Sequence, residues 1–264
     1  MKVAILGPEG TYTHQAADQY FGEKLEPVFY STITEVFESE ESRKIIPIEN
    51  TLGGDVEESI EQFQQISNLR IEAEQKIPIN HCLISNEKLE DIEAVKSHPQ
   101  ALSQCQSYIK NNNWKKEETG STAKAVTQLE ESKAAIASKI AAEINQAPII
   151  EKNIQDNKQN QTRFFIIRTE KVREESREPE KTSLIIEPEE DRPGILHEIL
   201  EKFAEKEINL THIQSRPKKT KLGEYYFYIE ANIKNKTQEF EEAKKQIKNI
   251  ADVKTLGKYP KGEK

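Results

Sequence analysis

The chain has 264 residues, a length that suits two domains better than one. Its net charge of −8 provides no overall positive field, which argues against binding to nucleic acid or to an anionic membrane surface. The first apolar run, residues 1–7, is too short for a signal peptide, and no segment reaches the length of a membrane span, so we expect a cytoplasmic protein. Neither cysteine belongs to a CxxC pair and no histidines have metal-binding spacing, so we expect no metal site.

The first part of the chain, residues 1–168, alternates short apolar runs with helical patterns, which predicts α/β layers with largely parallel sheets. Thr32 and Glu35 form a capping box that opens one helix. The pattern restarts near residue 80, which predicts two lobes, the second over about 79–152, as in periplasmic binding proteins. We expect strands at 3–6, 45–49, 79–84, 94–96, 134–137 and 164–167, and further helices at about 13–20, 56–66 and 97–109.

The second part of the chain begins after a charged stretch. Nine of the thirteen residues at 169–181 are charged, which is typical of a solvated linker. Residues 182–260 then predict a strand at 184–186, a helix at 193–206, strands at 208–213 and 225–233, a helix at 240–250 and a strand at 253–256. This βαββαβ order predicts an α+β domain of the ferredoxin-like fold.

Polar residues cluster where the predicted strands and helices of the first part meet. Residues 7–13 place glycines before a helix, where backbone N–H groups can bind an anion or simply form a turn. Residues 47–51 follow a strand, at the edge where α/β folds bind ligands, and Asp55 is expected to cap the next helix with Glu58 as its partner. Residues 97–100 cap another helix, and residues 162–164, Thr-Arg-Phe, begin the last strand with a hydroxyl and a fixed cation.

Together these segments resemble the prephenate dehydratase family in order and spacing, over nearly the whole chain. The matching segments are 7–13 with Ala16-Ala17, 47–51, 97–100 with Ala101-Leu102, 121–123, and 162–164 preceded by Asn153-Ile154-Gln155-Asp156. The C-terminal part resembles an ACT domain, with 194–197 and 214–217 at its two effector motifs. Thr51 stands where the family usually has Ser, Gln214 where Glu is usual, and Ile195 and His197 also depart from the common residues.

The resemblance implies conversion of prephenate to phenylpyruvate, with loss of water and CO2, by an enzyme without a metal or an organic cofactor. Because aromatisation drives the step, positioning and one proton donor are sufficient. Thr162 is expected to assist the leaving hydroxyl, although a buried Glu49 with a raised pKa remains the alternative donor. The remaining candidate substrate contacts are Asn50, Thr51, Ser97, Gln100, Ser121, Thr122, Arg163 and Phe164. Arg163 follows Thr162 on a strand, so its side chain is expected to point away from that of Thr162.

The ACT resemblance implies feedback regulation by phenylalanine and a homodimer or homotetramer formed through these domains. The candidate effector-binding residues are Gly194, Ile195, Leu196, Asn209, Leu210, Thr211, Gln214, Ser215, Arg216 and Pro217. No chorismate mutase helix precedes Met1, so we expect a chain without that second activity. Two alternatives stay open: arogenate as the substrate, and a non-catalytic amino-acid-binding regulatory protein with the same architecture.

Overall fold

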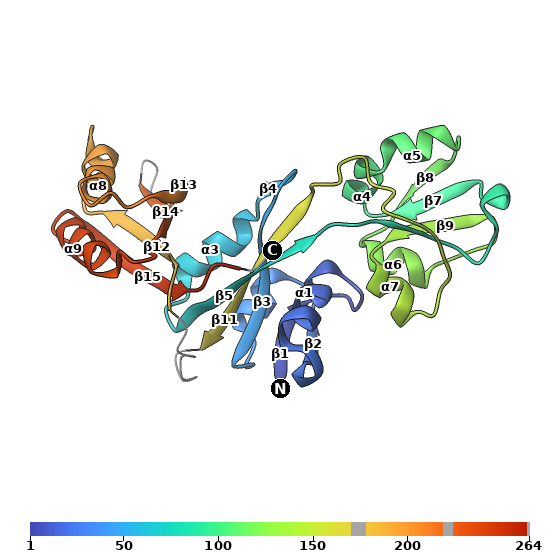
Figure 1. Cartoon of the computed structure of the whole chain (residues 1–264), viewed down its shortest axis with the longest axis horizontal. Coiled ribbons are helices and arrows are strands. Elements are labelled where there is room, and N and C mark those ends of the chain that lie inside the picture. Colours follow the sequence, from blue (N-terminus) through green and yellow to red (C-terminus); the bar gives the residue numbers. More distant parts are fainter. Residues whose placement is uncertain (170–177, 219–223, 263–264) are drawn as a thin grey trace. The chain divides into compact units, whose positions relative to one another are not determined.

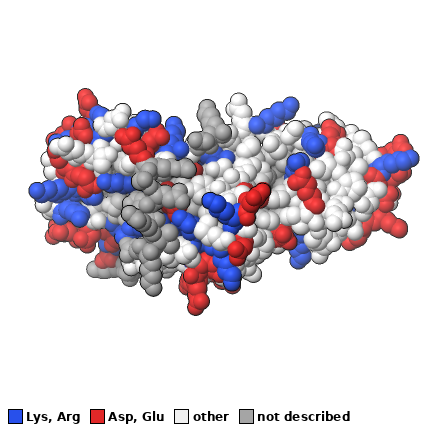
Figure 2. Space-filling view, turned by 60° about the horizontal axis from the view of Figure 1, so that its bottom comes forward, with Lys and Arg blue, Asp and Glu red and all other residues white. Residues whose placement is uncertain are grey.

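The computed structural model describes residues 1–169, 178–218 and 224–262 (Figure 1). These residues separate into two units, one formed by Met1–Ser59 and Gln75–Phe164, the other by Ile60–Glu74 and Phe165–Lys264. Within the described ranges, no helix combines the length and the apolar character that a membrane crossing needs. Positive and negative side chains are interspersed on the face drawn in Figure 2 rather than gathered into one basic area.

The first lobe is built on a sheet in which the buried strand β1 (Lys2–Leu6) pairs in parallel with β2 (Glu26–Tyr30) and β3 (Arg43–Asn50). The strand order is β2-β1-β3-β11-β5, and the short β4 pairs antiparallel with β3. The other elements are α1 (Tyr12–Phe21), η1 (Gly22–Lys24), α2 (Ile33–Glu38), β4 (Gly54–Asp55), α3 (Glu57–Gln65), β5 (Leu69–Pro78) and β11 (Gln161–Thr169). The predicted capping box at Thr32 and Glu35 is confirmed, with both reciprocal hydrogen bonds present.

The expected N-cap at Asp55 is wrong. Asp55 belongs to β4, where it is paired with Glu49, and α3 begins only at Glu57. The Glu58 carboxylate accepts instead from the backbone and the hydroxyl of Thr34, at 3.2 and 3.1 Å. At this turn Asp55 therefore pairs across the sheet, and Glu58 of α3 bonds to Thr34 of α2. A local sequence motif does not reveal such long-range partners.

The second lobe has a five-stranded sheet in the order β10-β6-β9-β7-β8. Strand β7 runs parallel to β8 and β9, whereas β6 is antiparallel to β9 and β10. Its elements are β6 (Cys82–Ile84), η2 (Leu89–Asp91), β7 (Ala94–Ser97), α4 (Pro99–Gln104), α5 (Gln106–Asn111), β8 (Lys115–Glu118), α6 (Thr122–Thr127), β9 (Lys133–Ala137), α7 (Lys139–Ile144) and β10 (Ile149–Lys152). The helix expected at 97–109 is two helices, because the chain leaves helical geometry at the fully buried Cys105.

The C-terminal part has the predicted βαββαβ order and an antiparallel sheet arranged β13-β14-β12-β15. Its elements are β12 (Lys181–Pro188), α8 (Ile195–Ala204), β13 (Leu210–Pro217), β14 (Tyr225–Asn232), α9 (Thr237–Ile247) and β15 (Ala251–Tyr259). Ile199 and Phe203 of α8 pack with Phe240 of α9 against Leu184 and Ile229 of the sheet, because both helices carry one apolar face. The α/β fold with a ferredoxin-like C-terminal domain is confirmed.

The charged stretch predicted as a linker at 169–181 falls mostly outside the described residues, which exclude 170–177. Its two ends belong to strands, since β11 ends at Thr169 and β12 begins at Lys181. The register of β12 against β14 and β15 starts at Lys181 itself. The first strand of the C-terminal domain therefore begins at the last residue of the predicted linker.

Candidate active site

A cavity of about 360 Å³ lies within the first unit and is lined by residues of both of its lobes. Four of the predicted site residues line it. Asn50 and Thr162 come from β3 and β11 of the first lobe, and Gln100 and Thr122 from α4 and α6 of the second. The fold thus brings together side chains separated by up to 112 positions in the sequence.

The Asn50 amide organises the first-lobe side of the cavity. Its Nδ2 donates to Thr162 Oγ1 at 2.9 Å, to Asn160 Oδ1 at 3.0 Å and to Gln161 O at 3.2 Å. Its Oδ1 accepts from the backbone N–H groups of Leu52 and Gly53, at 3.0 and 2.9 Å. Asn50 therefore fixes both the loop after β3 and the hydroxyl oxygen of Thr162.

Thr51 fixes the same loop against β11 from the other side. Its backbone N–H donates to Gln161 O at 2.9 Å and its hydroxyl donates to the same oxygen at 3.1 Å, while Gln161 N donates to Thr51 Oγ1 at 3.2 Å. A serine hydroxyl can make these bonds as well, which explains why a threonine is accepted here. Thr51 does not line the cavity, so its visible role is to hold the loop.

Arg163 and Glu49 form an ion pair beside the cavity rather than in its lining. Glu49 Oε2 accepts from Arg163 Nη2 at 3.0 Å and from Nε at 3.1 Å. The Arg163 side chain is 9% exposed and that of Glu49 is 41% exposed. Strand alternation turns Arg163 away from Thr162, as expected, and this pairing supports an orienting role for Glu49 more than that of a proton donor.

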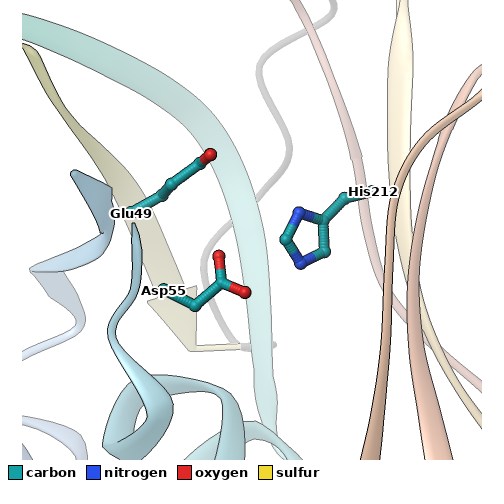
Figure 3. A group of neighbouring side chains, drawn as sticks. All are labelled: Glu49, Asp55 and His212. Carbon is teal, nitrogen blue, oxygen red and sulfur yellow. The ribbon is translucent and has the colours of Figure 1, made fainter. Parts of the chain in front are cut away.

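Figure 3 shows Glu49 and Asp55, whose side chains lie on the same face of the β3–β4 pair because the two residues are register partners. Asp55 lines the cavity and Glu49 does not. His212, drawn in the same figure, belongs to β13 of the other unit. The first unit thus contributes two carboxylates to this face, one of them at the cavity.

Three other predicted residues have structural partners. Ser97 is fully buried, and its hydroxyl donates to Ile136 O at 2.5 Å. Ser121 caps α6 by accepting from Lys124 N at 3.0 Å, which places Thr122 in the first turn at the cavity. Phe164 is 2% exposed and belongs to the core. These contacts hold the walls of the site. Neither Ser97 nor Phe164 lines the cavity.

In the glycine turn before α1, the N–H group of Gly10 is used internally. Gly10 N donates to His14 Nδ1 at 3.2 Å, His14 N donates to Thr11 Oγ1 at 3.4 Å, and Ser138 Oγ donates to Gly10 O at 2.8 Å. Burial lowers the pKa of His14, consistent with a neutral imidazole that accepts the first of these bonds. The geometry therefore supports a structural role for this turn, which joins α1 to the N-terminus of α7.

Five polar lining residues are absent from the sequence-based set, namely Tyr12, Asp55, His81, His98 and Gln104. Tyr12 begins α1, Gln104 ends α4, and His81 precedes β6. A lone histidine and a helical glutamine are common in any fold, so neither carries a signal of its own. Gln104 does lie four residues after the predicted Gln100, a spacing that places both side chains on one helix face.

The C-terminal domain contains a separate cavity of about 810 Å³. Four predicted effector residues line it, namely Gly194, Ile195, Leu196 and Ser215. Gly194 adopts a φ of 88° as the N-cap of α8, a conformation that favours glycine. Sequence reasoning missed the apolar wall formed by Leu200, Tyr225 and Phe227.

The other predicted effector residues do not line this cavity: Asn209, Leu210, Thr211, Gln214, Arg216 and Pro217. Asn209 O accepts from Asn232 N at 2.9 Å, and Leu210 packs against the domain core. Gln214 and Arg216 alternate with Ser215 along β13, so they face the opposite side of the sheet.

Comparison with known proteins gives two family matches. The prephenate dehydratase model matches residues 3–172, and the ACT domain model matches residues 183–249. The prephenate dehydratase of Methanocaldococcus jannaschii is 38% identical over 263 residues, which cover 96% of each chain. A protein of Arabidopsis thaliana named arogenate dehydratase/prephenate dehydratase 2 is 32% identical over 98% of this chain and 73% of its own length.

Solved structures agree with these matches. The prephenate dehydratase of Staphylococcus aureus is 29% identical with a TM-score of 0.86, covering 98% of this chain and all of that one. The prephenate dehydratase of Arthrobacter aurescens, solved in complex with L-Phe, is 28% identical with a TM-score of 0.88 over 98% of this chain and 90% of that one. The chain therefore belongs to the prephenate dehydratase family and carries a C-terminal ACT domain.

Proposed function

We propose that this protein is a hydro-lyase that converts prephenate to phenylpyruvate, and that Thr162 supplies the proton to the departing hydroxyl. The observation that carries the assignment of Thr162 is its hydrogen bond with Asn50 at the cavity. Because Oγ1 accepts from Asn50 Nδ2 and has no other partner among the described residues, the hydroxyl proton is left to point into the cavity.

The reaction breaks two bonds and consumes one proton. The ring C–O bond and the bond from the ring to its carboxylate both break, the electron pair of the carboxylate bond completes the aromatic ring, and the departing hydroxide takes a proton from Thr162 Oγ1. The products are phenylpyruvate, CO2 and water, and the threonine regains its proton from solvent. The Asn50 N–H stabilises the negative charge that develops on Oγ1, which a weakly acidic hydroxyl requires.

Neutral donors on the second lobe, above all Gln100 and Thr122, are candidates to bind the substrate carboxylates. None of the cavity-lining residues of the described ranges is Lys or Arg. Arg163 stays a proposed contact that would have to release Glu49 first. The cleft between two lobes lets one substrate contact both sets of donors.

The decisive experiment is turnover by the purified full-length chain with prephenate and, in parallel, with arogenate, following the aromatic products by absorbance. Higher kcat/KM with prephenate supports the proposal. Higher kcat/KM with arogenate would replace the substrate, and the name of the Arabidopsis relative makes this the natural second candidate. No turnover of either substrate would reject the catalytic role.

We also propose that L-phenylalanine binds in the cavity beside α8 and inhibits the enzyme. An apolar wall formed by Leu196, Leu200 and Phe227 suits an aromatic side chain, and the Arthrobacter relative was solved with L-Phe. Calorimetry and inhibition by phenylalanine test this directly. Leu200→Asp should weaken both because it places a charge in the apolar wall, whereas Lys202→Ala, on the same helix but outside the lining, should not.

The quaternary structure is proposed to be a homodimer or homotetramer formed through the ACT domains, in a cytoplasmic protein. Strand β13 lies at an edge of its sheet. Ile213 on this strand and Tyr225 at the start of the adjacent strand β14 are each 45% exposed. An unpaired edge with apolar side chains favours pairing with another copy. Light scattering at several concentrations, with Ile213→Lys as the variant, measures the assembly.

We place the catalytic part at 1–168 and the regulatory part at 182–260.

A further inference from the structure

Asn160, the residue before β11, has a buried side chain that contacts Asn50 from outside the cavity lining. It is 1% exposed and does not line the cavity. Its Oδ1 accepts from Asn50 Nδ2 at 3.0 Å, and its backbone oxygen accepts from Ile79 N at 2.9 Å. Asn160 and Thr162 are two positions apart, and both side chains accept from the same amino group of Asn50. Asn160 is therefore one step removed from the hydroxyl that the proposed chemistry uses.

The hydrogen bonds of Asn50 determine which end of each amide faces the other. Asn50 Oδ1 accepts from the backbone N–H groups of Leu52 and Gly53, which can only donate, so Nδ2 is the end directed at Asn160. Asn160 then has to present its oxygen, because two amino groups cannot bond to each other. Its own Nδ2 is buried and makes no hydrogen bond to any residue in the described ranges. Toward these residues, the Asn160 side chain thus serves as an acceptor for Asn50 alone.

These contacts set the plane of the Asn50 amide. Its oxygen is held by two backbone N–H groups, and Asn160 takes one of the two N–H bonds of Nδ2. The other N–H then has a fixed direction, and Thr162 Oγ1 lies at 2.9 Å from Nδ2. The competing acceptor, Gln161 O at 3.2 Å, already accepts from the backbone N–H and the hydroxyl of Thr51. Without the Asn160 oxygen, the Asn50 amide is held at its oxygen end only.

We infer that Asn160 is a positioning residue for catalysis, which acts through Asn50: its oxygen holds one N–H of the Asn50 amide so that the other is directed at Thr162 Oγ1. The inference rests on the proposed function, in which that N–H stabilises the charge that develops on Oγ1 as the proton leaves. A donor acts in this way when its direction is set before the reaction. Because Asn160 lies outside the cavity lining, it should affect kcat and leave substrate binding unchanged.

The first test compares Asn160→Leu with Gln159→Leu. Asn160→Leu keeps a side chain of similar size and removes the acceptor, whereas Gln159→Leu removes an amide from the exposed neighbouring position. We expect Asn160→Leu to lower kcat by about 5- to 50-fold, less than the outright removal of an oxyanion donor, with KM within about twofold of the unmodified value. Gln159→Leu should match the unmodified enzyme. A kcat for Asn160→Leu within about twofold of the unmodified value, or a loss that appears only in KM, rejects the inference.

The second test asks whether Asn160 acts through Asn50. In an Asn50→Ala background the amide that Asn160 holds is gone, so adding Asn160→Leu should change kcat by less than about twofold. A role of Asn160 in the fold alone does not depend on this amide and would lower kcat by the same factor in both backgrounds. Equal factors therefore reject the inference.

Thermal melting identifies any variant that fails to fold. If Asn160→Leu fails, Asn160→Ser repeats both measurements, because its oxygen is attached one bond nearer to the backbone and loses the 3.0 Å contact with Asn50 Nδ2. The outcomes also separate the two proposals. An unmodified chain that does not turn over prephenate or arogenate rejects the proposed function, whereas an active chain whose kcat is unaffected by Asn160→Leu rejects only the role of Asn160.

Discussion

The hydroxyl of Thr162 and the amide of Asn50 form the smallest unit that the proposed chemistry depends on. Thr162→Val keeps the shape of the side chain and removes the proton donor. We expect kcat to fall by about 10²- to 10⁴-fold, the usual contribution of a positioned proton donor, while Thr162→Ser keeps much of the activity. Steady-state kinetics measure this, with Thr127→Val on α6 as a matched control. Near-normal turnover by Thr162→Val would remove Thr162 from the mechanism.

The ion pair between Glu49 and Arg163 allows a second prediction at the scale of residues. Because Glu49 is 41% exposed and its partner is the Arg163 guanidinium, Glu49→Gln should cost the ion pair, about 1 kcal/mol or less, and reduce kcat by less than about tenfold. The pH dependence of kcat should keep its shape in the variant. If a loss of activity toward high pH in the unmodified enzyme disappears in Glu49→Gln, then Glu49 is the acid and Thr162 is not.

Several site residues were predictable from the sequence, and the reason differs from residue to residue. Asn50 and Thr162 follow or begin predicted strands of one sheet, so their side chains meet by simple topology. Ser97 was an equally suitable site residue by sequence, but its hydroxyl donates to Ile136 O inside the second lobe. His81 and Gln104 are brought within 2.8 Å only by the fold of the second lobe, a contact that no local pattern encodes.

At the scale of elements, the sequence predicts a strand where apolar residues form a run. It does not reveal a strand that is defined by backbone pairing alone. Strand β8 consists of four charged residues and is held by its register with β7, so no pattern indicates it. Strand β5 does alternate, with Leu69, Ile71 and Ala73 buried, and a stricter use of the period-two rule predicts it. The helices α6 and α7 are six residues each, shorter than a periodic pattern can identify.

The glycine turn before α1 allows a prediction about stability at the scale of elements. Gly10 has a φ of 85°, and a Cβ on it would lie 3.1 Å from the Cα of Ala141 in α7. Gly10→Ala therefore combines backbone strain with a clash against the second lobe, and we expect a loss of about 2–4 kcal/mol in the free energy of unfolding. Gly22→Ala is the matched control, because Gly22 also has a positive φ but nothing lies within 4 Å of its Cβ position.

Denaturant titration of the two glycine variants separates these causes. Gly22→Ala should show only the backbone cost, about 1–2 kcal/mol. Equal losses in both variants would mean that the approach of Gly10 to Ala141 contributes nothing to stability.

At the scale of the whole molecule, a buried charge cluster connects β5 with the C-terminal sheet inside the second unit. Lys181 Nζ, at the start of β12, binds Glu74 Oε2 at 2.8 Å and Glu230 Oε2 at 3.0 Å, and both carboxylates are almost fully buried. Glu230 also accepts from Tyr228 at 2.8 Å, and Glu74 from Gly262 N at 3.0 Å. Removing Lys181 takes its ammonium group away from two carboxylates that are buried from water.

Lys181→Met should therefore lower the free energy of unfolding by about 3–5 kcal/mol. Lys234→Met is the control, since the Lys234–Glu180 pair is exposed and should change stability by less than about 1 kcal/mol. Chemical denaturation of both variants measures the difference. A loss for Lys181→Met no larger than that of its control would show that the buried cluster does not hold the strand in place.

The uncharged character of the cavity lining has a consequence for how the enzyme responds to salt. A protein of net charge −8 repels a dianion at long range, and no Lys or Arg among the described lining residues offsets this locally. Added salt shortens the reach of that repulsion, to about 10 Å at 0.1 M, without weakening hydrogen bonds from amides and hydroxyls. We expect kcat/KM to hold steady or rise between about 0.02 and 0.3 M potassium chloride. A steep fall would reveal an ionic clamp on the substrate, with Arg163 as the first side chain to examine.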